Sequence, residues 1–142
     1  MNKNDNEIIL WVDDLRNPWK LGMCEKNTLW VLDYYQAINM LNARQDFHTI
    51  HLDNDLGENT PQGKAVFDYV EFMLHENKLP NLKAIFIHSD NASAVRIMLS
   101  AKEVFQEKYG VLVKQKMISR SQYSQSKIDT SVYENIMRES YN

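Results

Sequence analysis

The sequence predicts an α/β domain that is built on a parallel β-sheet. Five short runs rich in apolar, β-branched and aromatic residues alternate with segments of helical periodicity. Several of these runs are continuously apolar, which is typical of parallel strands covered on both faces. Strands that alternate with helices imply right-handed crossovers within one sheet. The expected strands are residues 7–12, 28–32, 49–52, 83–87 and 110–113.

The helix between the second and third strands is predicted from its first residues. Asp33 is suited to the N-cap position, and Gln36 follows three residues later, as in a capping box. The apolar residues that follow recur at helical spacing and would lie on one face. They are Tyr34, Ala37, Ile38 and Leu41.

Two further helices are expected before the fourth and fifth strands. The first of them begins near Pro61 or Gly63 and runs to about Asn77. The second begins after Asp90 or Asn91 and runs as a single helix toward the fifth strand. Their buried side chains are expected to be Val66, Val70 and Met73 in one and Ala94, Met98, Ala101 and Phe105 in the other.

Two segments show no convincing helical period. Residues 14–22 contain Pro18 and Gly22, so the first helix of the fold is expected to be reduced to a loop or a single turn. The tail, residues 117–142, is a polar extension in which a last helix is expected only around residues 131–138. We expect a single domain over residues 1–142, with a core of about residues 7–115. Five strands of this kind suit the flavodoxin-like order 2-1-3-4-5.

Length and composition exclude several classes of protein. A chain of 142 residues can bury a sizeable core as one domain. Its net charge of -3 argues against a strongly basic nucleic-acid binder. Cys24 is the only cysteine, which favours a reducing compartment, and the N-terminus lacks an apolar signal segment. No apolar run approaches the ~20 residues of a membrane span. We therefore expect a cytoplasmic protein without membrane association.

Polar clusters follow three of the predicted strands. They are Asp13 and Asp14 after the first strand, Asp53, Asn54 and Asp55 after the third, and His88 and Ser89 after the fourth. In open α/β sheets the carboxyl ends of parallel strands meet at one edge, where ligands bind. Carboxylates crowded there repel one another unless a cation or a proton lies between them. The pattern indicates a metal-assisted phosphate site.

The acidic residues are the candidate metal ligands. Asp13, Asp14, Asp53 and Asp55 offer the hard oxygen atoms that Mg²⁺ prefers. Asp53 and Asp55 are two residues apart, so both face one cation if the segment is extended, and only one does if the strand ends at Asp53. The alternative without a metal is that these residues are ordinary turn or N-cap residues.

Three other residues are candidates for the reaction itself. Ser89 could donate a hydrogen bond to a phosphoryl oxygen, and His88 could transfer a proton near neutral pH. Lys114 ends the fifth strand and could place a positive charge near the phosphate. His51 would be the weaker partner in a two-histidine phosphoesterase, because it lies inside the third strand. The alternatives are a structural histidine and an exposed lysine.

The order of these residues resembles the receiver superfamily of response regulators. An acidic pair follows the first strand, an Asp the third, a Ser the fourth and a Lys the fifth. Asp55 precedes Gly63 by eight residues, and the spacing of the receiver phosphoacceptor is similar. By this resemblance Asp55 is the equivalent of the acceptor.

The sequence is more similar to the receiver-like group that is proposed to process cyclic phosphates. That group shows an acidic pair followed by Arg and Pro, then Leu-Asp-His-Asp-Leu-Gly, then His-Ser-x-Asn before a helix that carries Met. Residues 13–18, 52–57 and 88–91 are similar, with Met98 downstream. Asn54 stands where the group has His, Ala92 where Pro is more typical, and Ala94 where Gly is.

The resemblance implies a metal-dependent phosphoesterase or binder with a receiver-like fold. Its ligand would be a cyclic or terminal phosphate on a small molecule, a nucleotide or an RNA end, and its cofactor would be Mg²⁺. Asp55, His88, Ser89 and Lys114 would carry the reaction. Two alternatives stay open, namely a phosphorylatable receiver that signals through a protein partner and a non-catalytic interaction module of the same fold.

Overall fold

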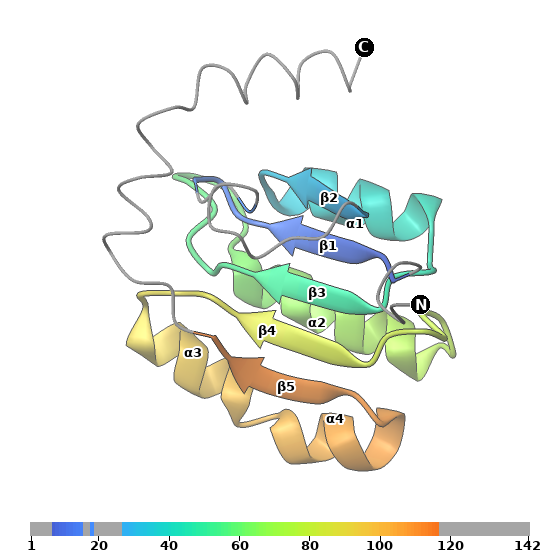
Figure 1. Ribbon diagram of the computed structural model, residues 1–142. Helices are drawn as coiled ribbons and strands as arrows, with labels where there is room; N and C mark the ends of the chain where they lie inside the picture. The colour runs from blue at the N-terminus through green and yellow to red at the C-terminus, as the bar shows by residue number, and fades with distance from the viewer. Residues whose placement is uncertain (1–6, 16–17, 19–26, 117–142) are drawn as a thin grey trace.

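The computed structural model describes residues 7–15, 18 and 27–116. Five parallel strands form one sheet in the order β2-β1-β3-β4-β5, which confirms the predicted fold class and strand order (Figure 1). The strands are β1 (Ile9–Val12), β2 (Thr28–Val31), β3 (Thr49–Leu52), β4 (Ala84–Ile87) and β5 (Leu112–Gln115). The predicted fifth strand was therefore placed about two residues too early.

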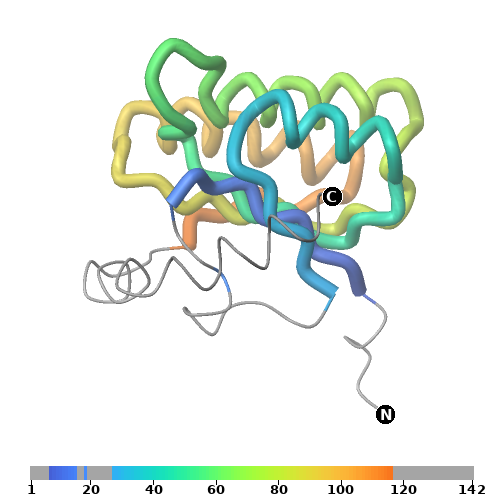
Figure 2. The backbone as a smooth tube through the Cα atoms, turned by 90° about the horizontal axis from the view of Figure 1, so that it is seen from above, coloured from blue at the N-terminus to red at the C-terminus, as the bar shows by residue number. Residues whose placement is uncertain are grey.

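The four described helices all lie on one face of the sheet (Figure 2). Successive crossovers from β2 to β3, β4 and β5 step in one direction across the sheet, and right-handed connections of this kind place their helices on the same side. The helices are α1 (Tyr34–Ala43), α2 (Gly63–His75), α3 (Ala92–Leu99) and α4 (Lys102–Tyr109).

The single helix predicted before β5 is wrong, because the chain forms α3 and α4 in its place. The break lies at Ser100 and Ala101. The hydroxyl of Ser100 donates a hydrogen bond of 2.5 Å to the carbonyl oxygen of Ile97, in competition with regular helical bonding. The apolar stripe nevertheless continues across the break, since Met98 and Phe105 are both buried. Gly110 ends α4 in the left-handed conformation, as expected for a helix terminator.

The capping pattern of α1 is confirmed with one difference. The Asp33 carboxylate accepts a hydrogen bond of 2.9 Å from the backbone N–H of Gln36. The Gln36 side chain accepts one of 2.8 Å from the backbone N–H of Leu32, one residue before the N-cap, whereas a capping box would reach the N-cap itself. Ala37 and Leu41 are buried on the predicted face.

The two faces of the sheet carry different kinds of side chain. The face toward the helices is apolar and belongs to the main hydrophobic core, with Leu10, Val12, Val31, Ile50, Leu52, Ile85, Ile87 and Val113. The strand register places a second row on the opposite face, namely Trp30, Trp11, His51, Phe86 and Lys114. Trp11, Trp30 and His51 are buried but stand outside the main core. We call this second surface the histidine face.

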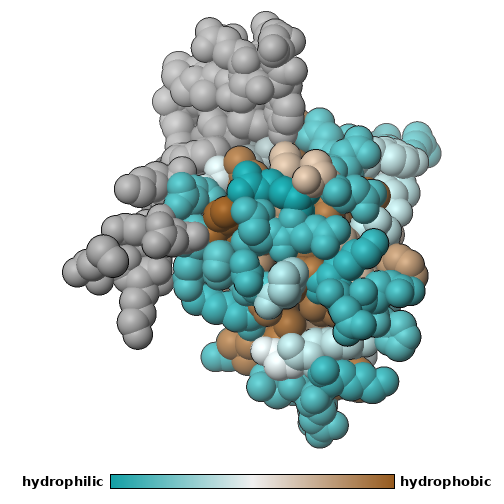
Figure 3. Space-filling view, turned by 90° about the vertical axis from the view of Figure 1, so that its right-hand side faces the viewer, coloured by the Kyte–Doolittle hydropathy of each residue, from teal (hydrophilic) through white to brown (hydrophobic). Residues whose placement is uncertain are grey.

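The described part of the segment after β1 agrees with the predicted loop. Asp14 and Leu15 lie in a bend and Pro18 in a turn, and none of these described residues is helical. The rest of that loop and the extension at residues 117–142, with its expected helix at 131–138, lie outside the described residues. In the described part of the chain, no helix combines the length and apolar character of a bilayer span. The end of the sheet where the strands begin presents mostly hydrophilic residues (Figure 3).

Candidate phosphate and metal site

The predicted acidic edge forms at the carboxyl ends of β1 and β3. Val12 and Leu52 are partners in the parallel register, so Asp13 and Asp53 follow at the same level. Both are almost completely buried, with 1% and 2% of their surface exposed, whereas Asp14 is exposed. Asp13, Asp14 and Asp53 each offer a carboxylate oxygen, and these oxygens lie within 4.8 Å of one another. We call these three residues the carboxylate cluster.

Backbone and side-chain contacts hold Asp13 in place. Its backbone N–H donates to the carbonyl oxygen of Val31 at 3.1 Å, and its own carbonyl accepts a 2.6 Å hydrogen bond from the indole N–H of Trp30. The carboxylate accepts from the backbone N–H of Leu15 at 2.9 Å, as in an Asx turn. On the facing strand, the backbone N–H of Asp53 donates to the carbonyl oxygen of Val12 at 2.8 Å. The positions of both carboxylates thus follow from strand pairing.

Gly63 and Asn54 bring the start of α2 against the loop after β3. A Cβ atom on Gly63 would lie 2.1 Å from the carbonyl oxygen of Asp53, so only glycine fits this approach. The backbone N–H of Gly63 donates to the carbonyl oxygen of Asn54 at 2.7 Å. The Asn54 side-chain oxygen accepts from the backbone N–H of Lys64 at 3.0 Å. Asn54 therefore satisfies two of the free N–H groups at the helix start.

Asp55 belongs to the same site but not to the carboxylate cluster. It is exposed and lines a pocket of about 380 Å³ together with Asp14 and Asp53. The full lining is Asp14, Leu15, Asp53, Asp55, Gly57, Glu58, Gln62 and Asp90. Among the described residues, this lining is rich in acid and contains no Lys, Arg or His. A phosphate could enter such a pocket only with a cation that offsets the negative charge.

Gln62 braces the loop that carries Asp55, a role that the sequence did not indicate. Its side-chain oxygen accepts from the backbone N–H of Leu56 at 2.7 Å, and its amide nitrogen donates to the carbonyl oxygens of Gly57 and Thr60 at 2.9 and 3.1 Å. Gly57 has a φ of 113°, a backbone conformation that favours glycine. A glutamine that precedes a glycine-started helix is the only sequence signal that could have indicated this brace.

His51 and His88 form a hydrogen-bonded pair on the histidine face. Their exposed fractions are 4% and 2%, and Nδ1 of His51 lies 2.6 Å from Nε2 of His88. Nδ1 of His88 lies 3.0 Å from the carbonyl oxygen of Lys116. Trp11 stacks on both imidazoles at centroid distances of 4.7 and 4.8 Å. On the other side, the Phe86 ring lies 5.1 Å from the His51 ring.

These contacts define the tautomers of the pair. A carbonyl oxygen only accepts, so Nδ1 of His88 must carry a proton. In a neutral His88, Nε2 is then the acceptor, and the hydrogen of their shared bond comes from Nδ1 of His51. Burial, followed by repulsion from a protonated His88 and from Lys116, lowers the pKa of His51 to about 2. His51 is therefore neutral at physiological pH.

Ser89 lies directly after His88 and is buried at the same edge. Its hydroxyl oxygen accepts a hydrogen bond of 3.1 Å from the backbone N–H of Asn91, so the hydroxyl hydrogen can still be donated to a ligand. The Asn91 side chain caps α3 by accepting from the backbone N–H of Ala94 at 3.0 Å. These two hydrogen bonds connect the end of β4 to the start of α3.

The register places Lys116, and not Lys114, at the level of the candidate site. Lys114 is the partner of Phe86, one step before the strand ends, and its side chain is exposed. The backbone N–H of Lys116 donates to the carbonyl oxygen of Ile87 at 2.9 Å, beside His88. Its ammonium group lies 5.7 Å from the centroid of the Phe86 ring. If the fifth strand had been predicted two residues later, the sequence would have indicated Lys116 as the lysine that follows it.

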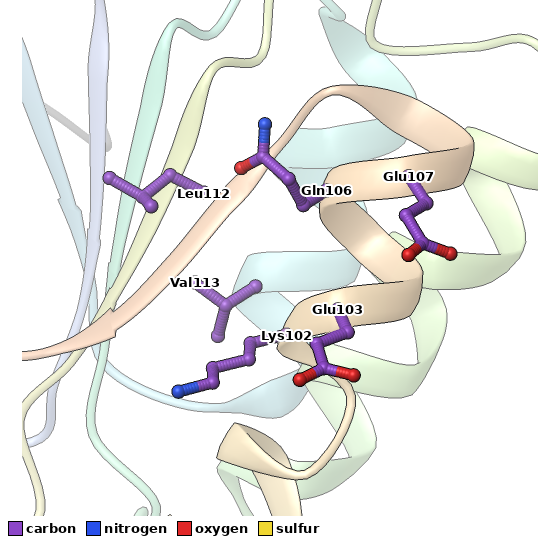
Figure 4. Close-up of a pocket in the computed structure, with 6 residues that line it drawn as sticks. All are labelled: Lys102, Glu103, Gln106, Glu107, Leu112 and Val113. Atoms are coloured by element: carbon purple, nitrogen blue, oxygen red, sulfur yellow. The ribbon is translucent and has the colours of Figure 1, made fainter.

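A second pocket lies away from this edge, between α4 and β5 (Figure 4). Its volume is about 250 Å³, and Leu112 and Val113 form one side of it. The other lining residues are Lys102, Glu103, Gln106 and Glu107 of α4. These side chains do not converge on a common point, so we assign no chemistry to this pocket.

The fold and the acidic edge together define the class of a receiver-like domain. The family model of the cyclic-phosphate processing receiver domain matches residues 8–103. This match spans more than half of the 142-residue chain, and the protein belongs to that family. No curated protein and no solved structure matches the chain significantly.

Proposed function

We propose that the protein binds Mg²⁺ at Asp13, Asp14 and Asp53 and uses it to hold a cyclic or terminal phosphate. The observation that carries this proposal is the approach of three carboxylate oxygens to within 4.8 Å at one sheet edge. Carboxylates from two strand ends are hard oxygen donors that suit Mg²⁺. Asp55, from the wall of the adjoining pocket, would complete the set of acids predicted from the sequence.

The other residues of the site have separate roles in this proposal. When bound, Mg²⁺ would polarise the phosphate or lower the pKa of a water molecule. Ser89 donates its hydroxyl hydrogen to a phosphate oxygen, and Lys114 or Lys116 supplies positive charge. Asp55 takes part in the hydrolysis of the bound phosphate. Proton transfer by His88 stays a prediction, and it requires that one of its two ring hydrogen bonds opens. The ligand is a small molecule or an RNA end, and the cytoplasmic location also stays a prediction.

Calorimetric Mg²⁺ titration and hydrolysis of a panel of cyclic phosphates test this proposal. We expect Asp53→Asn to abolish Mg²⁺ binding and Asp55→Asn to abolish hydrolysis. Asp68→Asn is the matched control, because Asp68 is an exposed acid on α2 that pairs with Lys64. Absence of Mg²⁺ binding by the wild type would refute the proposal and favour a non-catalytic interaction module. Binding without hydrolysis would identify a phosphate binder.

A phosphorylatable receiver is the second candidate function, and the position of Asp53 favours it. Asp53 directly follows β3 at the level of Asp13, whereas Asp55 lies two residues farther along the loop. Incubation with a small phosphodonor and Mg²⁺, followed by intact-mass measurement, tests this function. A gain of one phosphate supports this function, and location of that phosphate on Asp53 by peptide mapping identifies Asp53 as the acceptor, because loss in Asp53→Asn would also follow from loss of Mg²⁺. Loss in Asp55→Asn alone would instead support the acceptor inferred from the spacing to Gly63.

A further inference from the structure

The pair on the histidine face lies directly beneath the residues of the candidate site. His51 precedes Asp53 by two residues, and side chains two apart on a strand point to the same face. His88 immediately precedes Ser89, and it also contacts the residue that follows β5. The His51–His88 bond runs diagonally from β3 to β4, because the direct partner of His51 is Phe86. The pair thus joins three neighbouring strands at the edge where the phosphate would bind.

We propose that His51 and His88 are positioning residues, whose hydrogen bonds set the spacing between Asp53, Ser89 and the strand end after β5. This inference rests on the proposed function and adds a role that no sequence motif assigned to His51. While both ring hydrogen bonds of His88 are closed, the pair acts through the backbone and not by contact with the ligand.

The surroundings of the pair fit a positioning role. The two imidazoles are nearly parallel, with an angle of 9° and a centroid distance of 4.8 Å. Trp11 lies against both rings, and Trp11 itself precedes Asp13 by two residues on β1. Rotation of either ring would therefore meet an aromatic neighbour and also break a buried hydrogen bond. The stack consequently links the β1 end to the β3 and β4 ends.

A positioning role requires the hydrogen-bond donor of His51 and not only the volume of its side chain, and the variants are chosen to separate these two properties. His51→Asn keeps an N–H donor at the same number of bonds from the backbone as Nδ1 of histidine. His51→Leu keeps most of the volume but leaves Nε2 of His88 without its donor. Thr49→Val is a control on the same strand and the same face, two residues farther from the carboxylates. All three changes are at buried positions of β3.

The test combines Mg²⁺ affinity with direct detection of the tautomers. We expect His51→Leu to weaken Mg²⁺ binding about tenfold or more, as is typical when a supporting partner of a metal ligand is lost. We expect His51→Asn and Thr49→Val to stay within about threefold of the wild type. Nitrogen-15 NMR of the wild type should show both imidazoles neutral and protonated at Nδ1.

The outcomes separate the two proposals. A wild type that binds no Mg²⁺ overturns the proposed function and, with it, this inference. Mg²⁺ binding by the wild type with unchanged affinity in His51→Leu overturns the positioning role alone. Imidazoles protonated at Nε2 would also overturn it. If His51→Leu does not fold, as judged by circular dichroism, the decision rests on the tautomers and on whether His51→Asn keeps the Mg²⁺ affinity within about threefold of the wild type.

Discussion

Ile50 and His51 are neighbours on β3, yet they face opposite sides of the sheet and illustrate two different ways of building an interior. Ile50 is completely buried in the core that the helices cover. His51 is almost as buried, but its position depends on one hydrogen bond and on the ring contacts around it. Apolar packing is non-directional and tolerates many sequences, whereas a buried polar pair requires particular partners. We therefore expect the stability of the fold to depend mainly on the helix-covered face. The geometry of the candidate site should depend mainly on the histidine face.

The largest effect is expected from a cavity on the helix-covered face. Ile50→Ala should lower the free energy of unfolding by about 3 kcal/mol, because it removes buried methyl groups and leaves a cavity. Mg²⁺ affinity of the folded fraction should stay close to that of the wild type. Denaturant titration and calorimetry measure the two quantities. An equally large loss of Mg²⁺ affinity would show that the two faces are not separable.

Gly63→Ala should lower both the stability of the fold and the Mg²⁺ affinity of the site. The added Cβ would meet the Asp53 carbonyl oxygen at 2.1 Å, so the start of α2 or the loop after β3 must move. We expect a loss of about 2 kcal/mol in the free energy of unfolding, together with weaker Mg²⁺ binding. Ala65→Gly is a control in the same helical turn, where no such contact is involved. Unchanged Mg²⁺ affinity in Gly63→Ala would mean that the Asp53 backbone can shift without cost to the site.

The sequence predicted the helix-covered face better than the histidine face. A run such as Ile8 to Val12 is enough to indicate a buried parallel strand, because a strand that is covered on both faces has few polar residues. The break between α3 and α4 was missed because the apolar stripe from Met98 to Phe105 continues through it.

The sequence did not show the register between the strands or the local hydrogen bonds at the site, and this limited the prediction of the site. The acidic residues at the ends of β1 and β3 were identified, and the structure brings Asp13, Asp14 and Asp53 together. The spacing to Gly63 drew attention to Asp55, but a spacing in sequence does not show which of two acids faces the strand end. The sequence suggested a pair of His51 and His88, but their diagonal contact and the hydrogen bond between the two rings depend on the register of β3 and β4.

The pH dependence of stability should sharpen the comparison between the two faces. The pKa of His51 is about 2 in the folded chain, mainly because of burial, whereas an unfolded histidine has a pKa of about 6.5. The unfolded state therefore binds the extra proton first as the pH falls. The contribution of neutral His51 to stability is present above about pH 6.5 and is lost progressively below it.

The measurement is the difference in unfolding free energy between the wild type and His51→Asn at several pH values. Between pH 6 and pH 5 we expect this difference to fall by up to about 1.4 kcal/mol per pH unit. In the folded chain, the charge of Lys116 and, once His88 is protonated, the charge of His88 also oppose protonation of His51. Parallel curves for the two proteins would mean that His51 titrates normally in the folded state.

The smallest effect is expected from Lys114 in β5 and Lys116 directly after it. Their comparison distinguishes the lysine predicted from the sequence from the lysine that the register favours. Lys116 lies beside His88 at the level of the site, whereas Lys114 is exposed two residues earlier, within β5. With Mg²⁺ present, Lys116→Ala should weaken inorganic phosphate binding by about 1 kcal/mol, and Lys114→Ala by less than half of that. Raising the salt concentration should reduce the Lys116 effect, since charge screening weakens it. A larger effect of Lys114→Ala would return the phosphate-binding role to the lysine first predicted from the sequence and would place the ligand nearer the exposed edge of β5.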